Sequence, residues 1–368
     1  MKGKPIKVAF IVGGLPFGGV ENWLLDLVLP LKAESEIDPY VINLSGTGNL
    51  MSKYEKMGVE VLCIGSDKKS IKTHRLDTLL ELRKRLKEIQ PDVVHTMHFS
   101  ADYFGRLASL GLDVPVFCHV HNVKSERKTY RRLANKALSY ATTCYFSVSK
   151  EVASTVKKDH NIAERPSRVL YNAVDPAKLD VEPFDLSERH GLSGKTIVGV
   201  GRFVAQKNFD KLIKAFAIVS EQDPDASLLL LGDGGQMDDL KQLVQELQLD
   251  DKVCLPGYVN NADIPSYLKA AYVLAMPSEY EGLPITHVES LFCGLPAVVS
   301  EHVPSIEIAA DASLVCTTDV DDIAEKLVRV LSDTSLHSSL SQAALSIAPE
   351  YTIERYIELL MAAYREFL

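Results

Sequence analysis

Short apolar runs alternate with amphipathic stretches along almost the whole chain, and this alternation limits the possible folds more than any other feature. The apolar run at residues 8–12, for example, precedes a glycine-rich loop at 13–19 and an amphipathic stretch at 20–31. Repeated strand–helix–strand units are right-handed, and they build parallel sheets with helices on both faces. The alternation therefore predicts an α/β fold of the doubly wound type.

The predicted elements fall into two series. The first has strands at 8–12, 40–44, 59–64, 92–95 and 116–120, and helices at 20–31, 76–89 and 101–110. The second has strands at 196–200, 227–231, 253–255, 272–275 and 297–300, and helices at 209–221, 237–247, 285–292 and 320–331. A final helix is expected at 353–367, and the charged, proline-containing segment 175–194 is predicted to be a linker. A chain of 368 residues has room for two such domains.

Composition and charge exclude several classes of protein. Hydrophobic residues make up 46% of the chain and charged residues 24%, which is typical of a folded globular protein and not of a disordered chain or a disulfide scaffold. A net charge of -9 argues against a nucleic-acid binder. The charge is uneven, since residues 1–190 carry 28 Lys and Arg against 23 Asp and Glu, whereas the remainder is strongly acidic.

The six cysteines indicate a reducing compartment. None of them forms a CxxC pair, and most lie in apolar runs. They are therefore predicted to be reduced core residues of a cytoplasmic protein. No apolar run approaches the roughly 18 residues that a membrane-spanning helix needs.

The loops that follow the strands are where ligands of open parallel sheets bind. The first such loop, Leu15-Pro16-Phe17-Gly18-Gly19, opens a helix and matches neither a dinucleotide-binding fingerprint nor a P-loop. Its glycines would let a phosphate or a sugar approach the backbone at the positive end of the helix. A plain tight turn explains the same residues, and the spacing does not choose between the two.

Two cations lie on the loop after the first strand of the second series. Arg202 and Lys207 precede a predicted helix, and two cations beside a helix N-terminus suit a diphosphate. The alternative is an exposed loop with solvated charges.

The segment from Glu279 to Glu289 is the most informative one. It follows an apolar strand, and Gly282-Leu283-Pro284 makes a tight turn into a helix whose first N–H groups can hold an anion. Glu281 precedes this helix and Glu289 lies inside it, so both carboxylates can face a ligand with several hydroxyls. A glycosidase also uses two carboxylates, so the pair alone does not separate transfer from hydrolysis.

Histidines gather at two strand ends, His95 and His98 at one and His119 and His121 at the other. No carboxylate or thiolate at suitable spacing completes a zinc site, so we expect hydrogen bonds to a sugar or to nearby backbone and no metal. His74, His160, His190 and His337 are predicted to lie on the surface.

Basic residues crowd two stretches of the first half of the chain. One stretch contains Lys124, Arg127, Lys128, Arg131, Arg132 and Lys136, and the other Lys68, Lys69, Lys72, His74, Arg75, Arg83, Lys84, Arg85 and Lys87. Such surfaces suit an anionic membrane or a pyrophosphate-bearing acceptor, and an ordinary solvated helix face explains them equally well.

Taken together, these motifs resemble those of the GT-B glycosyltransferases of family 4, over nearly the whole chain. The matching segments are Gly18-Gly19-Val20-Glu21, Asp92-Val93-Val94-His95, His121-Asn122, Ser147-Val148-Ser149-Lys150, Asn172-Ala173-Val174-Asp175, Gly201-Arg202 with Lys207, Gly232-Asp233-Gly234, Pro277 to Pro284, and Glu289 with Cys293 to Val298. The most specific of them is the block that holds the family's E-x7-E pair, Glu281 and Glu289.

The resemblance implies that the chain is a retaining transferase with two Rossmann-like domains facing across a cleft. The N-terminal, acceptor-side domain would comprise 1–180 and 353–368, because the last helix of the family crosses back, and the donor domain 190–352. Arg202 and Lys207 would bind the diphosphate and stabilise the leaving nucleoside diphosphate.

The remaining site residues are also assigned through the resemblance. Glu281 would hold the transferred sugar together with Gly282, Leu283, Pro284 and Ile285. Other expected contacts are Glu289 with the ribose, Tyr258 and Val259 with the base, His121 with the sugar, and Gly18 and Gly19 with the donor phosphates. No metal or other cofactor is expected.

The resemblance implies transfer from a nucleotide-diphosphate sugar, with a UDP-sugar favoured, to a saccharide or lipid-linked saccharide in bacterial polysaccharide or glycolipid synthesis. The enzyme would be cytoplasmic, with the inner face of the cell membrane as a candidate location. Two departures are Ala173, where glycine is usual, and segment 300–307, which lacks the usual glycine pair and leaves the identity of the sugar open.

Other readings of the same fold are a nucleotide-sugar epimerase, a phosphorylase and a non-catalytic nucleotide-sugar-binding partner. A phosphorylase needs a pyridoxal lysine, for which the sequence has no distinctive segment. The intact set Arg202, Lys207, Glu281 and Glu289 argues against a dead site. A dinucleotide oxidoreductase is disfavoured because no G-x-G-x-x-G with a following ribose acid is present.

Overall fold

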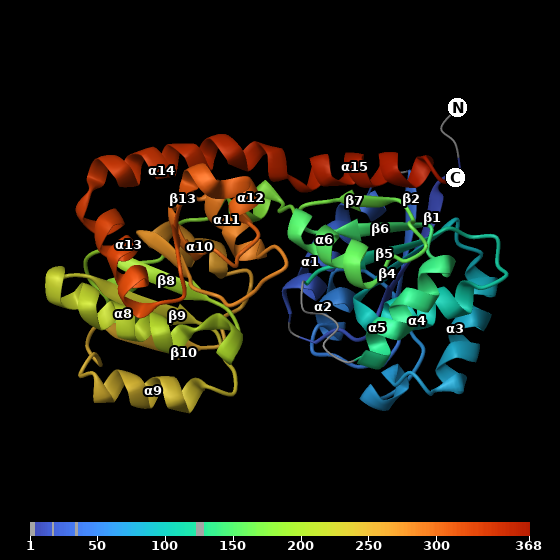
Figure 1. The fold of residues 1–368 in the computed structure, drawn as a ribbon, viewed down its shortest axis with the longest axis horizontal. Coiled ribbons are helices and arrows are strands. Elements are labelled where there is room, and N and C mark those ends of the chain that lie inside the picture. The colour runs from blue at the N-terminus through green and yellow to red at the C-terminus, as the bar shows by residue number, and fades with distance from the viewer. Residues whose placement is uncertain (1–3, 17, 34–35, 123–128) are drawn as a thin grey trace. The chain divides into compact units, whose positions relative to one another are not determined.

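The computed structural model describes residues 4–16, 18–33, 36–122 and 129–368 (Figure 1). They form two compact units: unit 1 is Met1–Tyr171 with Ile353–Leu368, and unit 2 is Asn172–Thr352. Both units have the parallel α/β architecture that the alternation of the sequence predicts.

Unit 1 contains a seven-stranded parallel sheet in the order β3-β2-β1-β4-β5-β6-β7. Its strands are β1 (Ile6–Val12), β2 (Ile37–Asn43), β3 (Val61–Cys63), β4 (Val93–Met97), β5 (Val116–Val120), β6 (Cys144–Ser147) and β7 (Ser167–Val169). The strand order reverses between β1 and β4, which are neighbours in the sheet and in register from Val8 against Val93. Ligands of such sheets bind at this reversal, outside the carboxyl ends of the strands.

The helices of unit 1 connect these strands, and one of them comes from the end of the chain. They are α1 (Gly19–Ala33), α2 (Met51–Lys56), α3 (Leu76–Ile89), α4 (His98–Ser109), α5 (Thr129–Leu138), α6 (Lys150–Asp159) and α15 (Ile353–Arg365). Helix α15, red in Figure 1, packs against α1, where the ring of Tyr356 lies edge-on against Trp23.

Unit 2 repeats the plan with a six-stranded parallel sheet in the order β10-β9-β8-β11-β12-β13. The strands are β8 (Thr196–Val200), β9 (Ser227–Leu231), β10 (Val253–Gly257), β11 (Val273–Met276), β12 (Ala297–Ser300) and β13 (Ser313–Cys316). The helices are α7 (Leu186–His190), α8 (Phe209–Gln222), α9 (Met237–Glu246), α10 (Ile264–Ala270), α11 (Ile285–Phe292), α12 (Ile306–Ala309), α13 (Val320–Ser332) and α14 (Thr334–Ile347). Here the order reverses between β8 and β11.

The predicted elements are confirmed where periodicity is strong, and several weaker elements were not foreseen. Helices α3 and α11 and strands β5, β8, β9 and β12 have the predicted bounds. Strands β6, β7 and β13 and helices α6, α10 and α14 carry no prediction. A capping signal marks two of these helices, since Ser149 Oγ accepts from Val152 N at 3.1 Å and Asp333 Oδ1 accepts from Leu336 N at 2.9 Å.

The expected linker at 175–194 is a packed part of unit 2, so that prediction is wrong. It contains a 3-10 turn at Pro176–Leu179 and helix α7, and Leu186 and Leu192 belong to a core cluster with strand residues of the unit 2 sheet. Prolines and charges suggested an open connection, but the apolar residues between them find partners only in the folded unit.

Two further expectations need correction. His160 is buried, whereas His190 and His337 are half-buried, and of the four histidines predicted to be exposed only His74 is so. All six cysteines are free, but Cys63 is exposed and does not lie in a core. Lys124, Arg127, Lys128 and Phe17 lie outside the described residues.

Two glycines of the packed segment provide a matched test of its packing. Gly191 and Gly194 both have φ of +69°, but a Cβ on Gly191 would meet nothing within 4 Å, whereas one on Gly194 would lie 2.0 Å from the carbonyl oxygen of Asp225. Gly191→Ala should cost about 1 kcal/mol of unfolding free energy, the strain of the left-handed backbone alone. Gly194→Ala should cost about 3 kcal/mol or more, because backbone must also move. Urea unfolding measures both, and equal losses would contradict the packed arrangement.

Buried imidazoles make the fold sensitive to acid. Burial, with a smaller effect of His121, lowers the pKa of His95 to about 3. Burial, followed by the charge of Arg106, lowers the pKa of His160 to about 4, and burial lowers the pKa of His287 to about 4. Below about pH 6.5 the unfolded chain binds protons at these sites that the folded chain does not bind, so stability falls as the pH drops toward 4.

Each such imidazole should reduce the unfolding free energy by about 1.4 kcal/mol per pH unit in this window. Denaturant titrations at about pH 7.5, 6 and 5 measure the slope. His287→Asn should make the slope shallower, whereas His74→Asn, at an exposed position, should leave it unchanged. A free energy that stays level across this range would contradict the prediction.

Candidate active site

The loop after β8 carries the two predicted phosphate-binding cations. Gly201 directly follows the strand, and the next turn, Ala205–Lys207, brings Lys207 back beside it, since a Cβ on Gly201 would lie 3.0 Å from Lys207 Cε. Arg202 is exposed, and its guanidinium has no hydrogen-bond or ion-pair partner among the described residues. The loop therefore holds one partly buried ammonium group and one available guanidinium group.

The loop after β11 supplies the partner of the lysine. Glu281 is only 9% exposed, and its Oε1 lies 2.6 Å from Lys207 Nζ. These residues are 74 positions apart in the sequence and follow the two strands between which the strand order reverses. The structure therefore brings Lys207 and Glu281 together at the carboxyl edge of the unit 2 sheet.

Further hydrogen bonds join the same two loops and fix their geometry. Glu279 N donates to the carbonyl oxygen of Gln206 at 2.8 Å, and Gln206 Nε2 donates to the carbonyl oxygen of Tyr280 at 2.7 Å. Asn208 Nδ2 donates to the carbonyl oxygen of Pro277 at 2.8 Å. The geometry of the ion pair is thus held by hydrogen bonds between the two loops and does not depend on the attraction between the two charges alone.

Helix α11 begins directly after this loop, with Pro284 as its first flanking residue and no side-chain cap. Its first turn leaves N–H groups without intrahelical acceptors, so the positive end of the helix is available to an anion. Asn172 Nδ2 donates to the carbonyl oxygen of Leu283 at 2.7 Å and holds the turn. Glu289 lies half-buried on α11, two turns beyond Glu281.

The loops after β9 and β10 complete this edge of the sheet. Gly232 N donates to the carbonyl oxygen of Gly257 at 3.1 Å, and Phe203 N donates to the carbonyl oxygen of Asp233 at 2.9 Å. Tyr258 and Val259 follow Gly257, with Tyr258 53% exposed and Val259 half-buried. Backbone contacts therefore connect the loop of the predicted base-binding residues to the loop of Arg202.

In unit 1 the glycine-rich loop follows β1, and Gly19 begins α1. Asn22 Nδ2 donates to the carbonyl oxygen of Gly18 at 2.9 Å and itself accepts from Lys53 Nζ at 2.8 Å. A Cβ on Gly18 would lie 2.2 Å from a carboxylate oxygen of Glu21, so a larger residue there would require that carboxylate to move. An acid therefore lies beside the loop that was expected to contact phosphates.

His121 follows β5 and is 8% exposed, and neither ring nitrogen has a hydrogen-bond partner in the described chain. Its ring centroid lies 4.0 Å from that of His119 and 5.6 Å from that of Trp23. Burial, followed by the neighbouring His119 and His98, lowers the pKa of His121 well below its usual value. The imidazole is therefore neutral at physiological pH and has one donor and one acceptor to offer.

His98 was expected only to hydrogen-bond a sugar or nearby backbone and was not among the assigned site residues, but the structure places it beside Glu21. It begins α4 at the carboxyl end of β4 with φ of +71°, and its Nε2 lies 3.6 Å from Glu21 Oε1. Burial alone lowers the pKa of His98, but the hydrogen bond and charge of Glu21, with Asp102, raise it overall. Its position after a strand end was a usable signal, but its pairing with Glu21 depends on the strand order.

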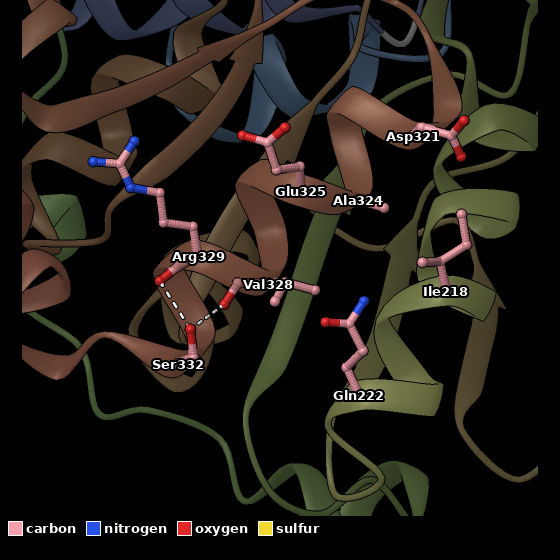
Figure 2. A pocket seen from close by; sticks show the side chains of 8 residues that line it. All are labelled: Ile218, Gln222, Asp321, Ala324, Glu325, Val328, Arg329 and Ser332. Atoms are coloured by element: carbon pink, nitrogen blue, oxygen red, sulfur yellow. Dashed lines mark hydrogen bonds between the residues drawn. The ribbon is translucent and has the colours of Figure 1, made fainter.

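A groove between α8 and α13 lies apart from these loops (Figure 2). Its polar lining includes Gln222, Asp321, Glu325, Arg329 and Ser332. Figure 2 shows these side chains projecting from the two helices and not from strand ends. With two carboxylates against one guanidinium, this lining does not suit a diphosphate.

Comparison with known proteins adds independent findings. Residues 184–346 match the model of the family described as glycosyl transferases group 1, and residues 17–178 match that of glycosyltransferase family 4. The Escherichia coli UDP-Gal:alpha-D-GlcNAc-diphosphoundecaprenol alpha-1,3-galactosyltransferase is 30% identical over 78% of this chain and 79% of its own length. An uncharacterized glycosyltransferase of Haemophilus influenzae is 23% identical over 96% of this chain and 98% of its own.

Solved structures of other proteins have the same fold. The structure of Anabaena HepE in complex with UDP and glucose superposes with a TM-score of 0.86 at 20% identity, covering 98% of this chain and all of that one. The segment that matches the group 1 model, 184–346, contains Glu281 and Glu289. The chain therefore belongs to the group 1 glycosyltransferases of family 4 and has the GT-B fold.

Proposed function

We propose that this glycosyltransferase moves a hexose from a UDP-sugar, with retention of configuration, to a saccharide or lipid-linked saccharide acceptor. The observation that carries the proposal is the Lys207–Glu281 pair at 2.6 Å, beside the available guanidinium of Arg202. The name of the Escherichia coli relative specifies a UDP-sugar donor and a diphosphate-linked lipid acceptor, which supports the same classes here. Bacterial polysaccharide or glycolipid synthesis is the proposed setting.

Unit 2 is proposed as the donor domain, with Arg202 and Lys207 as ligands of the diphosphate. An ammonium group has three N–H donors, and the bond to Glu281 engages one of them. The other two, with the guanidinium of Arg202, are suited to phosphate oxygens. These cations would stabilise the negative charge that develops on the leaving UDP.

The remaining contacts in unit 2 are assigned by the chemistry of their groups. Glu281 accepts hydrogen bonds from hydroxyls of the transferred sugar, and the N–H groups of Gly282, Leu283 and Ile285 contact the donor. Glu289 binds the ribose hydroxyls, whereas Tyr258 and Val259 lie against the base. All of these groups follow strand ends or lie in α11.

Unit 1 is proposed as the acceptor-side domain, with His121 contacting the transferred sugar. A buried neutral imidazole with two unpartnered nitrogens can both donate to and accept from a hydroxyl. Gly18 and Gly19 are proposed to approach the donor phosphates. Because Glu21 lies over Gly18, this approach requires the charge of Glu21 to stay balanced by His98.

In the proposed reaction the bond between the anomeric carbon and the phosphate oxygen breaks through an oxocarbenium-like state. The acceptor oxygen forms its new bond on the same face, and its proton passes to the leaving phosphate. The two cations do the work that a metal ion does in other transferases. We therefore propose that the reaction needs no metal or other cofactor.

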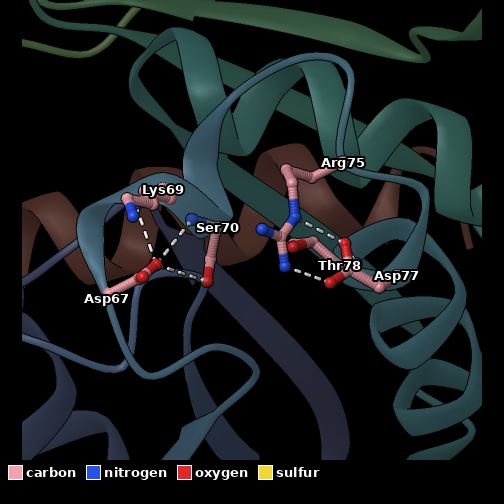
Figure 3. A network of polar contacts seen from close by, with 6 residues as sticks. All are labelled: Asp67, Lys69, Ser70, Arg75, Asp77 and Thr78. Atoms are coloured by element: carbon pink, nitrogen blue, oxygen red, sulfur yellow. Dashed lines mark hydrogen bonds and ion pairs between the residues drawn. The ribbon is translucent and has the colours of Figure 1, made fainter.

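A lipid-linked acceptor would require the enzyme to work at the cytoplasmic face of the membrane, and two basic surfaces of unit 1 suit such a location. In the described residues no helix is long and apolar enough to cross a bilayer. Lys68 and Lys69 lie on a 3-10 turn that Asp67 caps, and Arg75 pairs with Asp77 at the start of α3 (Figure 3). The α3 side chains Leu76 and Leu80 are exposed among these cations.

The second basic surface lies on α5. Helix α4 packs against both α3 and α5. Helix α5 exposes Tyr130 and Leu133 beside Arg131, Arg132 and Lys136. Exposed apolar side chains among cations are typical of helices that rest on an anionic bilayer. We propose that unit 1 contacts the membrane through this face.

The donor site generates the first functional prediction. UDP or a UDP-sugar should raise the midpoint of thermal unfolding, because it binds only the folded state. Lys207→Ala and Glu281→Ala should each reduce turnover about 100-fold or more. Lys214→Ala removes the same charge from an exposed position on α8, where Lys214 Nζ lies 3.9 Å from Asp210, and should leave turnover near that of the wild type.

The same assay separates the competing functions. Near-wild-type turnover in both site variants would refute the proposed site. Product formed from the donor without any acceptor would indicate an epimerase, and a thermal shift without turnover on any acceptor would indicate a binding partner. Loss of turnover in excess chelator, restored by Mg²⁺ or Mn²⁺, would refute metal independence.

The membrane contact generates a second prediction. Replacing Arg131 and Arg132 by Glu should reduce co-sedimentation with vesicles rich in anionic lipid by about tenfold or more, since each cation near the surface contributes about 1 kcal/mol. Replacing Lys157 and Lys158, exposed on α6, by Glu makes the same charge change on another helix. Equal losses in both variants would assign the binding to net charge and overturn the α5 contact.

A further inference from the structure

A chain of buried polar side chains runs from the C-terminal helix to the histidines of unit 1. Tyr364 on α15, His95 on β4 and His119 on β5 are all fully buried. Tyr364 Oη lies 2.5 Å from His95 Nδ1, and His95 Nε2 lies 3.2 Å from His119 Nδ1. The first of these contacts joins residues 269 positions apart, so α15 supplies a group that the sheet lacks.

The hydrogen-bond partners of these atoms determine which ring nitrogen of His95 and of His119 carries the proton. If Tyr364 donates to His95, then His95 donates from Nε2 to His119, and only the Nε2–H of His119 lacks a partner among the described residues. In the opposite direction both the hydroxyl proton of Tyr364 and the Nε2 lone pair of His119 are left without partners. Because an unmade buried hydrogen bond is costly, the first arrangement is the favoured one.

The chain ends against the histidine that we propose to contact the sugar. The rings of His119 and His121 lie 4.0 Å apart with an interplanar angle of 36°, and Trp23 packs edge-on against both. A change in the tautomer or orientation of His119 therefore changes the surface on which His121 rests. A charge on either ring would also be held close to the other in a buried site.

We infer that Tyr364 and His95 are positioning residues, which fix His119 as the Nε2–H tautomer and thereby hold the His121 ring in the orientation that binds the sugar hydroxyl. This inference rests on the proposed function, because it takes the sugar contact of His121 from there. It assigns the C-terminal helix a role in the site beyond its packing against α1.

Burial keeps the participating imidazoles neutral, as the relay requires. It lowers the pKa of His95 to about 3 and, with the neighbouring histidines, that of His119 well below its usual value. The titratable groups that face them are His121, His98 with Glu21, and Tyr364. A neutral ring with one protonated nitrogen is a directional donor and acceptor, which a doubly protonated ring is not.

The test removes one oxygen from α15. Tyr364→Phe keeps the ring against Phe117, whose centroid is 5.0 Å away, and deletes only the hydroxyl that donates to His95. We expect kcat to fall about tenfold, with a smaller change in the KM of the donor, since one buried hydrogen bond no longer orients the histidines. In protein labelled with ¹⁵N-histidine, the ring nitrogens of His95 and His119 should change from one tautomer to a mixture.

Tyr356→Phe is the matched control, because it deletes the same atom from the same helix. The hydroxyl of Tyr356 is buried and has no hydrogen-bond partner in the described chain, while its ring packs edge-on on Trp23 at 5.1 Å. We expect this variant to keep wild-type kcat and wild-type histidine tautomers. A loss of kcat equal to that of Tyr364→Phe would show a general effect of α15 and overturn the relay.

A measurement on the wild-type chain tests the inference without any variant. Ring nitrogen shifts that show His119 protonated at Nδ1 would overturn it, and protonation at Nε2 would support it. His121→Ala separates the two proposals, since its unchanged turnover would refute the sugar contact. Wild-type kcat and unchanged tautomers in Tyr364→Phe, beside a large loss in His121→Ala, would refute only the relay.

Discussion

The reversal of strand order beside the first strand of each sheet is the constraint on which both groups of site residues depend. In unit 2 the reversal lies between β8 and β11, and in unit 1 between β1 and β4. Neighbouring strands at such a point send their loops away in opposite directions, so polar groups at their ends are not covered by a crossover helix. Lys207 and Glu281 meet at the first reversal, and Glu21 and His98 meet at the second.

The Lys207–Glu281 pair also explains how both charged side chains can be largely buried. Its two side chains are 17% and 12% exposed, so each would pay a desolvation cost if it stood alone. Pairing offsets that cost and leaves an ammonium group with donors to spare, while Arg202 remains available. The backbone hydrogen bond from Glu279 to Gln206 and the side-chain hydrogen bond from Gln206 to Tyr280 keep the two loops at this distance before any ligand arrives.

The sequence predicted features that depend on neighbouring residues, but it did not predict contacts between distant parts of the chain. Strand β9 is buried along its whole length, so its apolar run could be recognised without its neighbours, and Arg202 and Glu281 were found because they follow such runs. By contrast, the pairing of Lys207 with Glu281 and the contact of Tyr364 with His95 join distant parts of the chain. Segment 175–194 looked like a linker because its composition is that of a loop, whereas its burial depends on the cluster around Leu186 and Leu192.

Glu21 shows how the two kinds of information combine. Its place after Gly18-Gly19 could be read from the sequence and suggested a helix start that suits an anion. The structure puts its carboxylate over Gly18, where it would repel a phosphate if its charge were not balanced. A protonated His98 balances it from the end of β4, in a left-handed backbone conformation that non-glycine residues rarely adopt, and Glu21 raises the pKa of His98 against the effect of desolvation. His98 therefore contributes to the electrostatics of the site, because it pairs with Glu21 beside the reversal of strand order, and its strained backbone is explained by that role.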